Sequence, residues 1–151
     1  ADIEGREGEV NHCDYGIQLT RGFRALKLWM SLKFYGRAAF SRAQEWGFEL
    51  AELAEAVVGE MPGWQVVTPA QMGVVTFRCA PQGLGEEELD RLQTALVEAM
   101  IADGFAMVSS TVLRHRTVLR ICTINPRTTE DDIQETLVRL ARMGQEIVAK
   151  R

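Results

Sequence analysis

Arg120 is the residue whose type and setting most directly suggest chemistry in this sequence. It lies inside the run Val118-Leu119-Arg120-Ile121-Cys122-Thr123-Ile124, where strand alternation places it on one face with Val118, Cys122 and Ile124. A guanidinium among apolar neighbours needs water, a carboxylate partner or a ligand. Two interpretations stay open: a solvated or internally paired arginine, and bidentate capture of an anionic substrate group, for which the planar guanidinium is well shaped.

A basic stripe near the beginning of the chain is the second candidate. Arg21, Arg24 and Lys27 recur every three residues, which places them on one side of a helix. A solvated helix face explains this stripe, and a phosphate site is the alternative, although no glycine-rich loop precedes it. The same segment is rich in aromatic residues, which we expect to pack partly against protein outside this sequence; these are Phe23, Trp29, Phe34 and Tyr35.

Other kinds of catalytic or metal site find little support. The sequence has two histidines, His12 and His115, too few to assemble a Ser-His-Asp or Cys-His set. His12-Cys13-Asp14 lacks the second pair of ligands that zinc sites use, so we expect no metal. His115 is expected in an exposed turn. The three cysteines are far apart, which fits a reduced, cytoplasmic protein.

Two helices are predicted in the first part of the chain. Apolar residues at spacings of three and four indicate one helix from Gln18 to Tyr35 and another from Arg37 to Gly59. The period then changes to that of strands at Trp64–Thr68 and Val74–Cys79. Pro69–Gly73 separates these two strands, which suggests a hairpin.

The same strand pair and helix pattern follows a second time. Three glutamates from Glu86 begin a helix that is expected to end at Gly104. Strands are predicted at Phe105–Leu113 and Thr117–Ile124, and a last helix after Asn125-Pro126-Arg127. Its capping box is expected to pair Thr128 or Thr129 with Asp131 or Asp132. The predicted fold is α+β: two helices, then strand-strand-helix-strand-strand-helix, with helices covering one sheet face.

Composition and charge limit the possible partners. The formal net charge is −4 and no long apolar run is present, so we expect neither nucleic-acid binding nor membrane insertion. We divide the chain into an extended entry segment (1–15), a helical segment (16–59) and an α+β domain (60–151). The polar, glycine-rich start without a methionine suggests a cut inside a longer chain.

Two stretches of the sequence resemble one enzyme family. Asp14–Trp29, with the letters FRALKLW, and Leu32–Gly36 (LKFYG) are similar to a segment of the group II pyridoxal-phosphate-dependent amino-acid decarboxylases. This family includes the aromatic-L-amino-acid, histidine and glutamate decarboxylases. Leu119–Cys122 and Asn125–Ile133 resemble the family's last strand and the turn into its final helix. One departure is Arg21-Gly22, where many members have two arginines; within a helix this glycine costs about 1 kcal/mol relative to Ala.

The resemblance implies the carboxy-terminal part of a homodimeric fold-type I enzyme. Residues 16–59 would come from the large domain and 60–151 would form the small domain. Pyridoxal phosphate, the electron sink of the reaction, would be held by an amino-terminal part outside this chain. None of the lysines here, Lys27, Lys33 and Lys150, follows a histidine as the family's cofactor lysine does.

The resemblance also assigns a role to the strand arginine. The family's small domain supplies an arginine that meets the carboxylate of the amino-acid substrate, and Arg120 matches its position. Arg24 would be a supporting residue near the domain junction. An aromatic L-amino acid is the first expectation for the substrate, and this chain alone is expected to be inactive. The alternatives are a free-standing, non-catalytic α+β module that binds a small ligand or a partner, and, more weakly, an aminotransferase of the same fold type.

Overall fold

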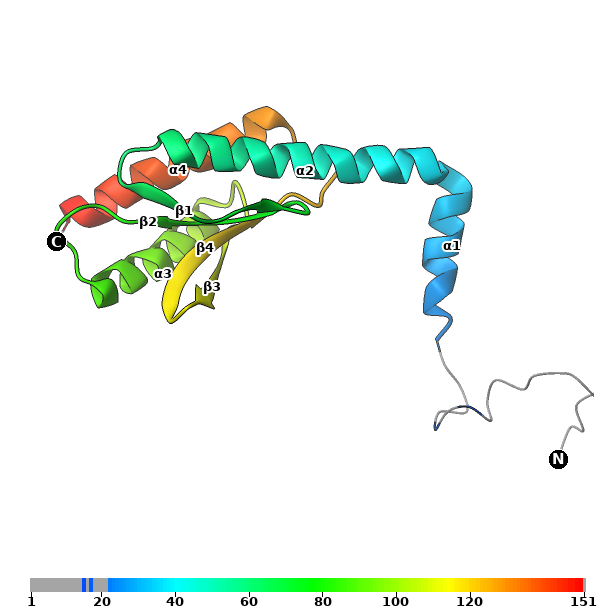
Figure 1. Ribbon diagram of the computed structural model, residues 1–151, viewed down its shortest axis with the longest axis horizontal. Coiled ribbons are helices and arrows are strands. Elements are labelled where there is room, and N and C mark those ends of the chain that lie inside the picture. The colour runs from blue at the N-terminus through cyan, green and yellow to red at the C-terminus, as the bar shows by residue number, and fades with distance from the viewer. Residues whose placement is uncertain (1–14, 16, 18–21, 151) are drawn as a thin grey trace, which may run out of the picture. The chain divides into compact units, whose positions relative to one another are not determined.

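The structure is a computed structural model that describes residues 15, 17 and 22–150. The elements follow in the order α1 (Arg24–Tyr35), α2 (Arg37–Glu60), β1 (Trp64–Gln71), β2 (Val74–Cys79), α3 (Glu86–Asp103), β3 (Ser109–Leu113), β4 (Arg116–Cys122) and α4 (Glu130–Ala149) (Figure 1). The α+β class and the strand-strand-helix-strand-strand-helix order are therefore confirmed. Contacts divide the chain into two compact units, Ala1–Arg37 and Ala38–Arg151.

The second unit is built on one antiparallel sheet with the strand order β1-β2-β4-β3. β1 and β2 form one hairpin, β3 and β4 form another, and α3 connects them so that β4 lies beside β2. The β3–β4 hairpin closes through Arg114 and His115, whose φ angles of 50° and 64° fit a two-residue type I′ turn. This turn fixes which residues of β3 and β4 face one another.

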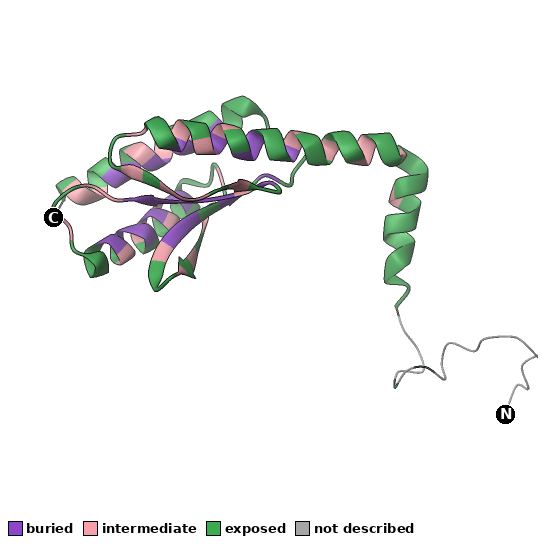
Figure 2. Ribbon diagram, viewed as in Figure 1, coloured by how far each residue is buried: buried purple, intermediate pink, exposed green. Residues whose placement is uncertain are grey.

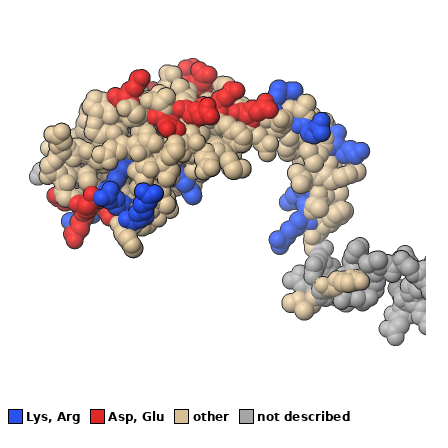
Figure 3. Space-filling model, viewed as in Figure 1, with Lys and Arg blue, Asp and Glu red and all other residues tan. Residues whose placement is uncertain are grey.

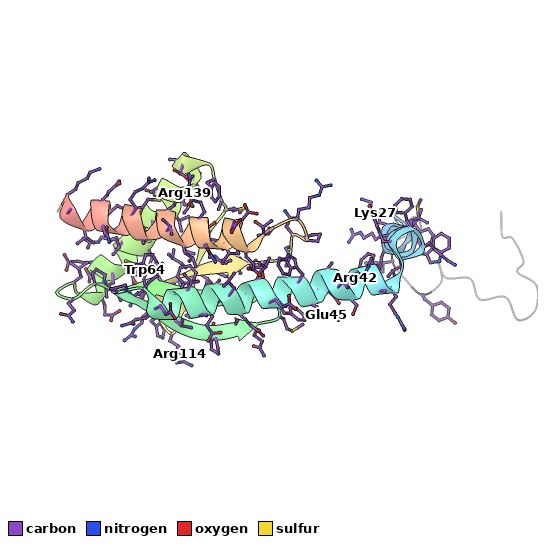
Figure 4. All side chains as sticks on the ribbon, turned by 90° about the horizontal axis from the view of Figure 1, so that it is seen from above. Lys27, Arg42, Glu45, Trp64, Arg114 and Arg139 are labelled. Carbon is purple, nitrogen blue, oxygen red and sulfur yellow. The ribbon has the colours of Figure 1, made fainter. Side chains whose placement is uncertain are left out.

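One face of the sheet and three helices share a single hydrophobic core. Because Val75 pairs with Ile121 and Phe77 with Leu119, these four side chains lie on the same face. They belong to one buried cluster with apolar residues of α2, α3 and α4, and α2 and α4 run side by side over the sheet (Figures 1 and 4). Figure 2 shows the buried residues on the inner sides of these elements. The core therefore covers this face of the sheet.

Polar side chains join α3 to the sheet where β2 and β4 separate. The β2–β4 ladder ends at Phe77 and Leu119. Beyond it, the buried Gln93 amide accepts from the backbone N–H of Cys79 at 2.9 Å and donates to its carbonyl at 2.8 Å. Asp90 accepts the backbone N–H of Thr117 at 2.8 Å. The side chains of α3 thus satisfy backbone groups that would otherwise be buried without partners.

The ends of the strands differ from the sequence-based prediction. β1 continues past Thr68 to Gln71 and includes Pro69, which is tolerated because β1 is an edge strand with register shifts in this region. Phe105–Val108, predicted as strand, is irregular because the β3–β4 pairing stops at Ser109 and Arg120. β4 ends at Cys122, two residues before the predicted Ile124.

The first helix is shorter than predicted. α1 begins at Arg24, and Gly22 and Phe23 are not helical, which agrees with the low helix propensity of glycine. Because Gly22 lies outside α1, the predicted cost of about 1 kcal/mol for a glycine within the helix does not apply. The predicted helix start at Gln18–Thr20 lies outside the described residues. No residue of α1 is buried, and Figure 2 colours it almost wholly as exposed. The predicted apolar stripe thus has no partner within the first unit's described residues.

The second helix ends one residue after its predicted end and contributes to the core of the second unit. Its buried residues include Leu50, Ala54 and Val58, and the backbone of Gly47 approaches Thr123 so closely that a Cβ there would lie 2.5 Å from the Thr123 carbonyl oxygen. Most of α2 thus belongs to the second compact unit, and the boundary between the two units lies between residues 37 and 38. The division of the complete protein at residues 59 and 60 stays a prediction.

Candidate functional site

Arg120 lies in the middle of β4 with its side chain exposed. Its neighbours across the ladders are Thr76 on β2 and Ser109 on β3. The Nε of Arg120 donates a hydrogen bond to the Ser109 hydroxyl at 3.2 Å. Within residues 22–150, none of the ion pairs involves Arg120. The guanidinium thus faces solvent and has no acidic partner among the described residues.

The face of the sheet opposite the core carries Thr76, Arg78, Val118 and Arg120, and we call it the second face. Val118 is buried, as is Thr76, whose hydroxyl lies 2.6 Å from that of Thr68. On the second face, the small side chains of Thr76 and Val118 are therefore buried beside Arg120, whose long side chain is exposed to solvent.

Arg78 has the opposite surroundings on the same face. Its side chain is 4% exposed, with Nη1 2.8 Å from the Glu86 carboxylate and Nη2 2.6 Å from that of Asp90. The hydrogen bond from Arg78 is the main reason why the pKa of Glu86 lies below its ordinary value, and the charges of Arg78 and Arg116 act in the same direction. Two carboxylates thus occupy the guanidinium of Arg78, whereas none of the described carboxylates pairs with that of Arg120.

The described lysines do not fit a cofactor site. Lys27 and Lys33 are exposed on α1, where Lys33 lies over the Trp29 ring, and Lys150 is exposed after α4 (Figure 4 labels Lys27). A lysine that forms a Schiff base is activated by a desolvating pocket or a nearby cation. None of these lysines is buried.

Arg24 and the basic stripe belong to the first unit. Arg24 is the first residue of α1 and is exposed, as is Lys27, and Figure 3 shows basic side chains along this helix. Arg21 lies outside the described residues. A cation at the amino end of a helix is placed unfavourably in the helix dipole, which agrees with a role other than stabilising α1. The supporting role of Arg24 stays a prediction.

The remaining candidates differ in accessibility. His115 is exposed in the β3–β4 turn, as predicted. Burial raises the pKa of the Cys79 thiol to about 11, which makes it unreactive at neutral pH, whereas Cys122 is exposed. The described residues contain no cluster of three or more metal-ligating side chains, and none of their helices is long and apolar enough to cross a membrane. His12, Cys13 and Asp14 lie outside the described residues.

Sequence reasoning singled out Arg120 but missed the hydroxyl groups around it. Alternation identifies a charged residue on one strand, but not which residues of neighbouring strands stand opposite. Ser109 could have been found by counting back from a two-residue turn at Arg114 and His115. The pairing of Thr76 with Arg120 depends on how β2 and β4 meet across α3, for which the sequence carries no local signal.

Comparison with known proteins identifies the family. The model of the pyridoxal-dependent decarboxylase conserved domain matches residues 7–80. An aromatic-L-amino-acid decarboxylase of Bacillus atrophaeus is 43% identical over 142 residues, which cover 93% of this chain. The chain belongs to the pyridoxal-dependent decarboxylase family. Tyrosine decarboxylase 2 of Arabidopsis thaliana is 32% identical over 88% of this chain. The present chain spans 30% of the length of the Bacillus atrophaeus relative and 24% of the length of the Arabidopsis thaliana relative.

Solved structures of the family agree in fold. The crystal structure of Oryza sativa TDC with PLP and tryptamine matches 89% of this chain at 27% identity and a TM-score of 0.79, and the match covers 29% of that chain. Mouse CSAD in apo form matches with a TM-score of 0.82 at 24% identity and 31% of its length, which shows the fold. The predicted fold and family are thus confirmed. The family model ends at residue 80, before Arg120.

Proposed function

We propose that this decarboxylase-family chain forms the carboxy-terminal part of a pyridoxal-phosphate-dependent L-amino-acid decarboxylase, in which Arg120 binds the substrate carboxylate. The observation that carries this proposal is the exposed guanidinium of Arg120, which has no acidic partner among the described residues. Its Nη groups can donate two parallel hydrogen bonds to a carboxylate. In a decarboxylation, the group bound in this way is the one that leaves.

The remaining parts of the reaction are assigned to the rest of the enzyme. We assign the cofactor lysine to the rest of the complete enzyme, an assignment supported by the exposure of all three lysines of this chain, Lys27, Lys33 and Lys150. Bound pyridoxal phosphate stabilises the negative charge that develops on the α-carbon when the carboxylate departs. An aromatic L-amino acid is the proposed substrate, supported by the name of the Bacillus atrophaeus relative. We also propose a cytoplasmic homodimer, with Arg24 supporting the junction between domains.

The test compares Arg120→Lys with Arg114→Lys in the complete enzyme. Arg114 is a matched control because it is exposed and lies at the end of the same hairpin (Figure 4). Lysine keeps the charge but loses the second parallel hydrogen bond. Loss of one charge-assisted hydrogen bond corresponds to roughly a 10- to 100-fold decrease in kcat/KM. We expect this decrease for Arg120→Lys and parent-like kinetics for Arg114→Lys.

The kinetics are measured with L-tryptophan, L-tyrosine and L-phenylalanine. Equal kcat/KM values in the two variants would refute the role of Arg120. An enzyme that turns over none of the three substrates, but does turn over an acidic or basic amino acid, would refute the aromatic substrate and leave the role of Arg120 to be measured with the accepted one.

A further inference from the structure

Arg120 stands between two strands that each present a hydroxyl group, and these hydroxyls are used differently. On the β2 side, the Thr76 hydroxyl accepts the Thr68 backbone N–H at 3.2 Å and shares a 2.6 Å hydrogen bond with the Thr68 hydroxyl. Thr76 is therefore engaged with β1. On the β3 side, the Ser109 hydroxyl accepts from the Nε of Arg120. Of Thr76 and Ser109, only Ser109 therefore forms a hydrogen bond with the guanidinium of Arg120.

The position of Ser109 results from the geometry of the hairpin. The type I′ turn at Arg114 and His115 sets the register in which Ser109 is directly opposite Arg120. Directly paired residues have Cβ atoms about 4.5–5.5 Å apart, so a short hydroxyl side chain reaches the stem of a facing arginine rather than its tip. The Ser109 hydroxyl also lies 3.5 Å from the Arg120 carbonyl oxygen, to which it can donate while accepting from Nε.

We infer that Ser109 is a positioning residue that holds the guanidinium of Arg120 in the orientation required to bind the substrate carboxylate. This inference rests on the proposed function of Arg120. A guanidinium can meet a carboxylate through its two Nη groups or through Nε and one Nη. Because Ser109 occupies Nε, the edge formed by the two Nη groups is left for the substrate. The same hydrogen bond restricts the rotamers of a long side chain that is otherwise exposed.

The experiment uses Ser109→Ala, Ser109→Thr and the control Ser110→Ala in the complete enzyme with bound pyridoxal phosphate. Ser110 is the exposed neighbour on the other face of β3, opposite Leu119. Fixing a flexible side chain accounts for a few-fold to tenfold change in binding, so we expect Ser109→Ala to raise KM about three- to tenfold with little change in kcat. Ser109→Thr keeps the hydroxyl and suits a strand, so its KM is expected to equal that of the parent. The KM of Ser110→Ala is also expected to equal that of the parent.

A second measurement separates positioning from a general effect on the fold. The amine product lacks the carboxylate, so its inhibition constant is expected to be the same for the parent and Ser109→Ala. An equal loss of affinity for the amino acid and its amine would overturn the inference, as would a KM for Ser109→Ala equal to that of Ser110→Ala. The failure of Arg120→Lys to change kcat/KM would instead refute the proposed function, and the inference with it.

Discussion

Two arginines on the second face of the sheet, Arg78 and Arg120, have contrasting neighbours. Arg78 is buried against Glu86 and Asp90, whereas Arg120 is exposed and bonded only to the Ser109 hydroxyl among the contacts of the described residues. A buried charge without partners is strongly unfavourable, so the acids beside Arg78 stabilise the fold. No acid of the described residues pairs with Arg120, which is why we propose a ligand for its charge.

The ion pairs of Arg78 lead to a prediction about stability. Asp90 accepts hydrogen bonds from both Arg78 and the backbone of Thr117. Asp90→Ala is expected to lower the free energy of unfolding by about 2–3 kcal/mol, since hydrogen bonds to charged groups contribute roughly 1.5–3 kcal/mol. The measurement is urea unfolding of the purified chain, followed by tryptophan fluorescence.

The control for Asp90→Ala is Glu87→Ala on the same helix. Glu87 pairs with Arg91, and both side chains are exposed, so its removal is expected to change stability by less than about 0.5 kcal/mol. Equal losses in the two variants would contradict the importance of the link between α3 and the strands.

At the scale of elements, the capping box of α4 predicts a pH dependence. Hydrogen bonds from Thr129 hold the pKa of Asp132 below its ordinary value, and its carboxylate also lies at the favourable end of the helix dipole. A group whose pKa is lower in the folded state stabilises the fold above its unfolded pKa, about 3.9 for Asp. This stabilisation is lost as the pH falls through the folded-state pKa.

Asp132→Asn tests this prediction because asparagine keeps an acceptor but carries no charge. The variant is expected to unfold at a lower temperature than the parent at pH 7, and the difference to shrink toward zero below about pH 4. Asp131→Asn removes the same charge from the same helix turn without affecting the hydrogen bond from Thr129. The measurement is thermal unfolding by circular dichroism from pH 7 to pH 3. Identical pH profiles for the two variants would argue against the contribution of the capping box.

The elements also show which features local sequence patterns determine. The periods of apolar residues predicted the order of helices and strands, and Thr129, Asp132 and Gly104 occupy capping positions within the predicted sets. The strand ends were predicted less well, because a strand ends where its partner does. Phe105–Val108 has a strand-like sequence but no ladder, and Pro69 suggested a turn although an edge strand accommodates it.

At the scale of the whole molecule, the candidate site was predictable only in part. Arg120 stood out because a charged residue inside an apolar strand is conspicuous in the sequence. That none of the described acids pairs with it was not predictable, because Asp90 and Glu86 could have faced either strand arginine, and only the packing of α3 places them beside Arg78. Acidic side chains gather along α2 and basic ones along α1 in Figure 3, a contrast that the net charge of −4 does not reveal.

The two compact units predict different behaviour of the chain in solution. The whole hydrophobic core lies within Ala38–Arg151, whereas α1 exposes eight large apolar residues or aromatics, counting its cap: Phe23, Leu26, Leu28, Trp29, Met30, Leu32, Phe34 and Tyr35. Exposed apolar surface of this kind favours association. We expect the 151-residue chain to self-associate and a variant that lacks residues 1–37 to be monomeric with an unchanged urea midpoint. Analytical ultracentrifugation measures the association.

A variant of the intact chain separates the effect of α1's apolar surface from that of chain length. Trp29→Gln combined with Phe34→Gln removes two large exposed rings and is expected to weaken the association, whereas Lys27→Gln on the same helix is expected to preserve it. Burial of the two rings upon association would contribute roughly 2 kcal/mol or more each, which is enough to shift the dissociation constant by over tenfold. Association that persists in the double variant and in the truncated chain would place the contact on the second unit.

The truncated chain also tests whether the boundary at residues 37 and 38 is a folding boundary. Because α2 lies mostly in the second unit and supplies part of its core, loss of cooperative unfolding in the truncated chain would show that it is not.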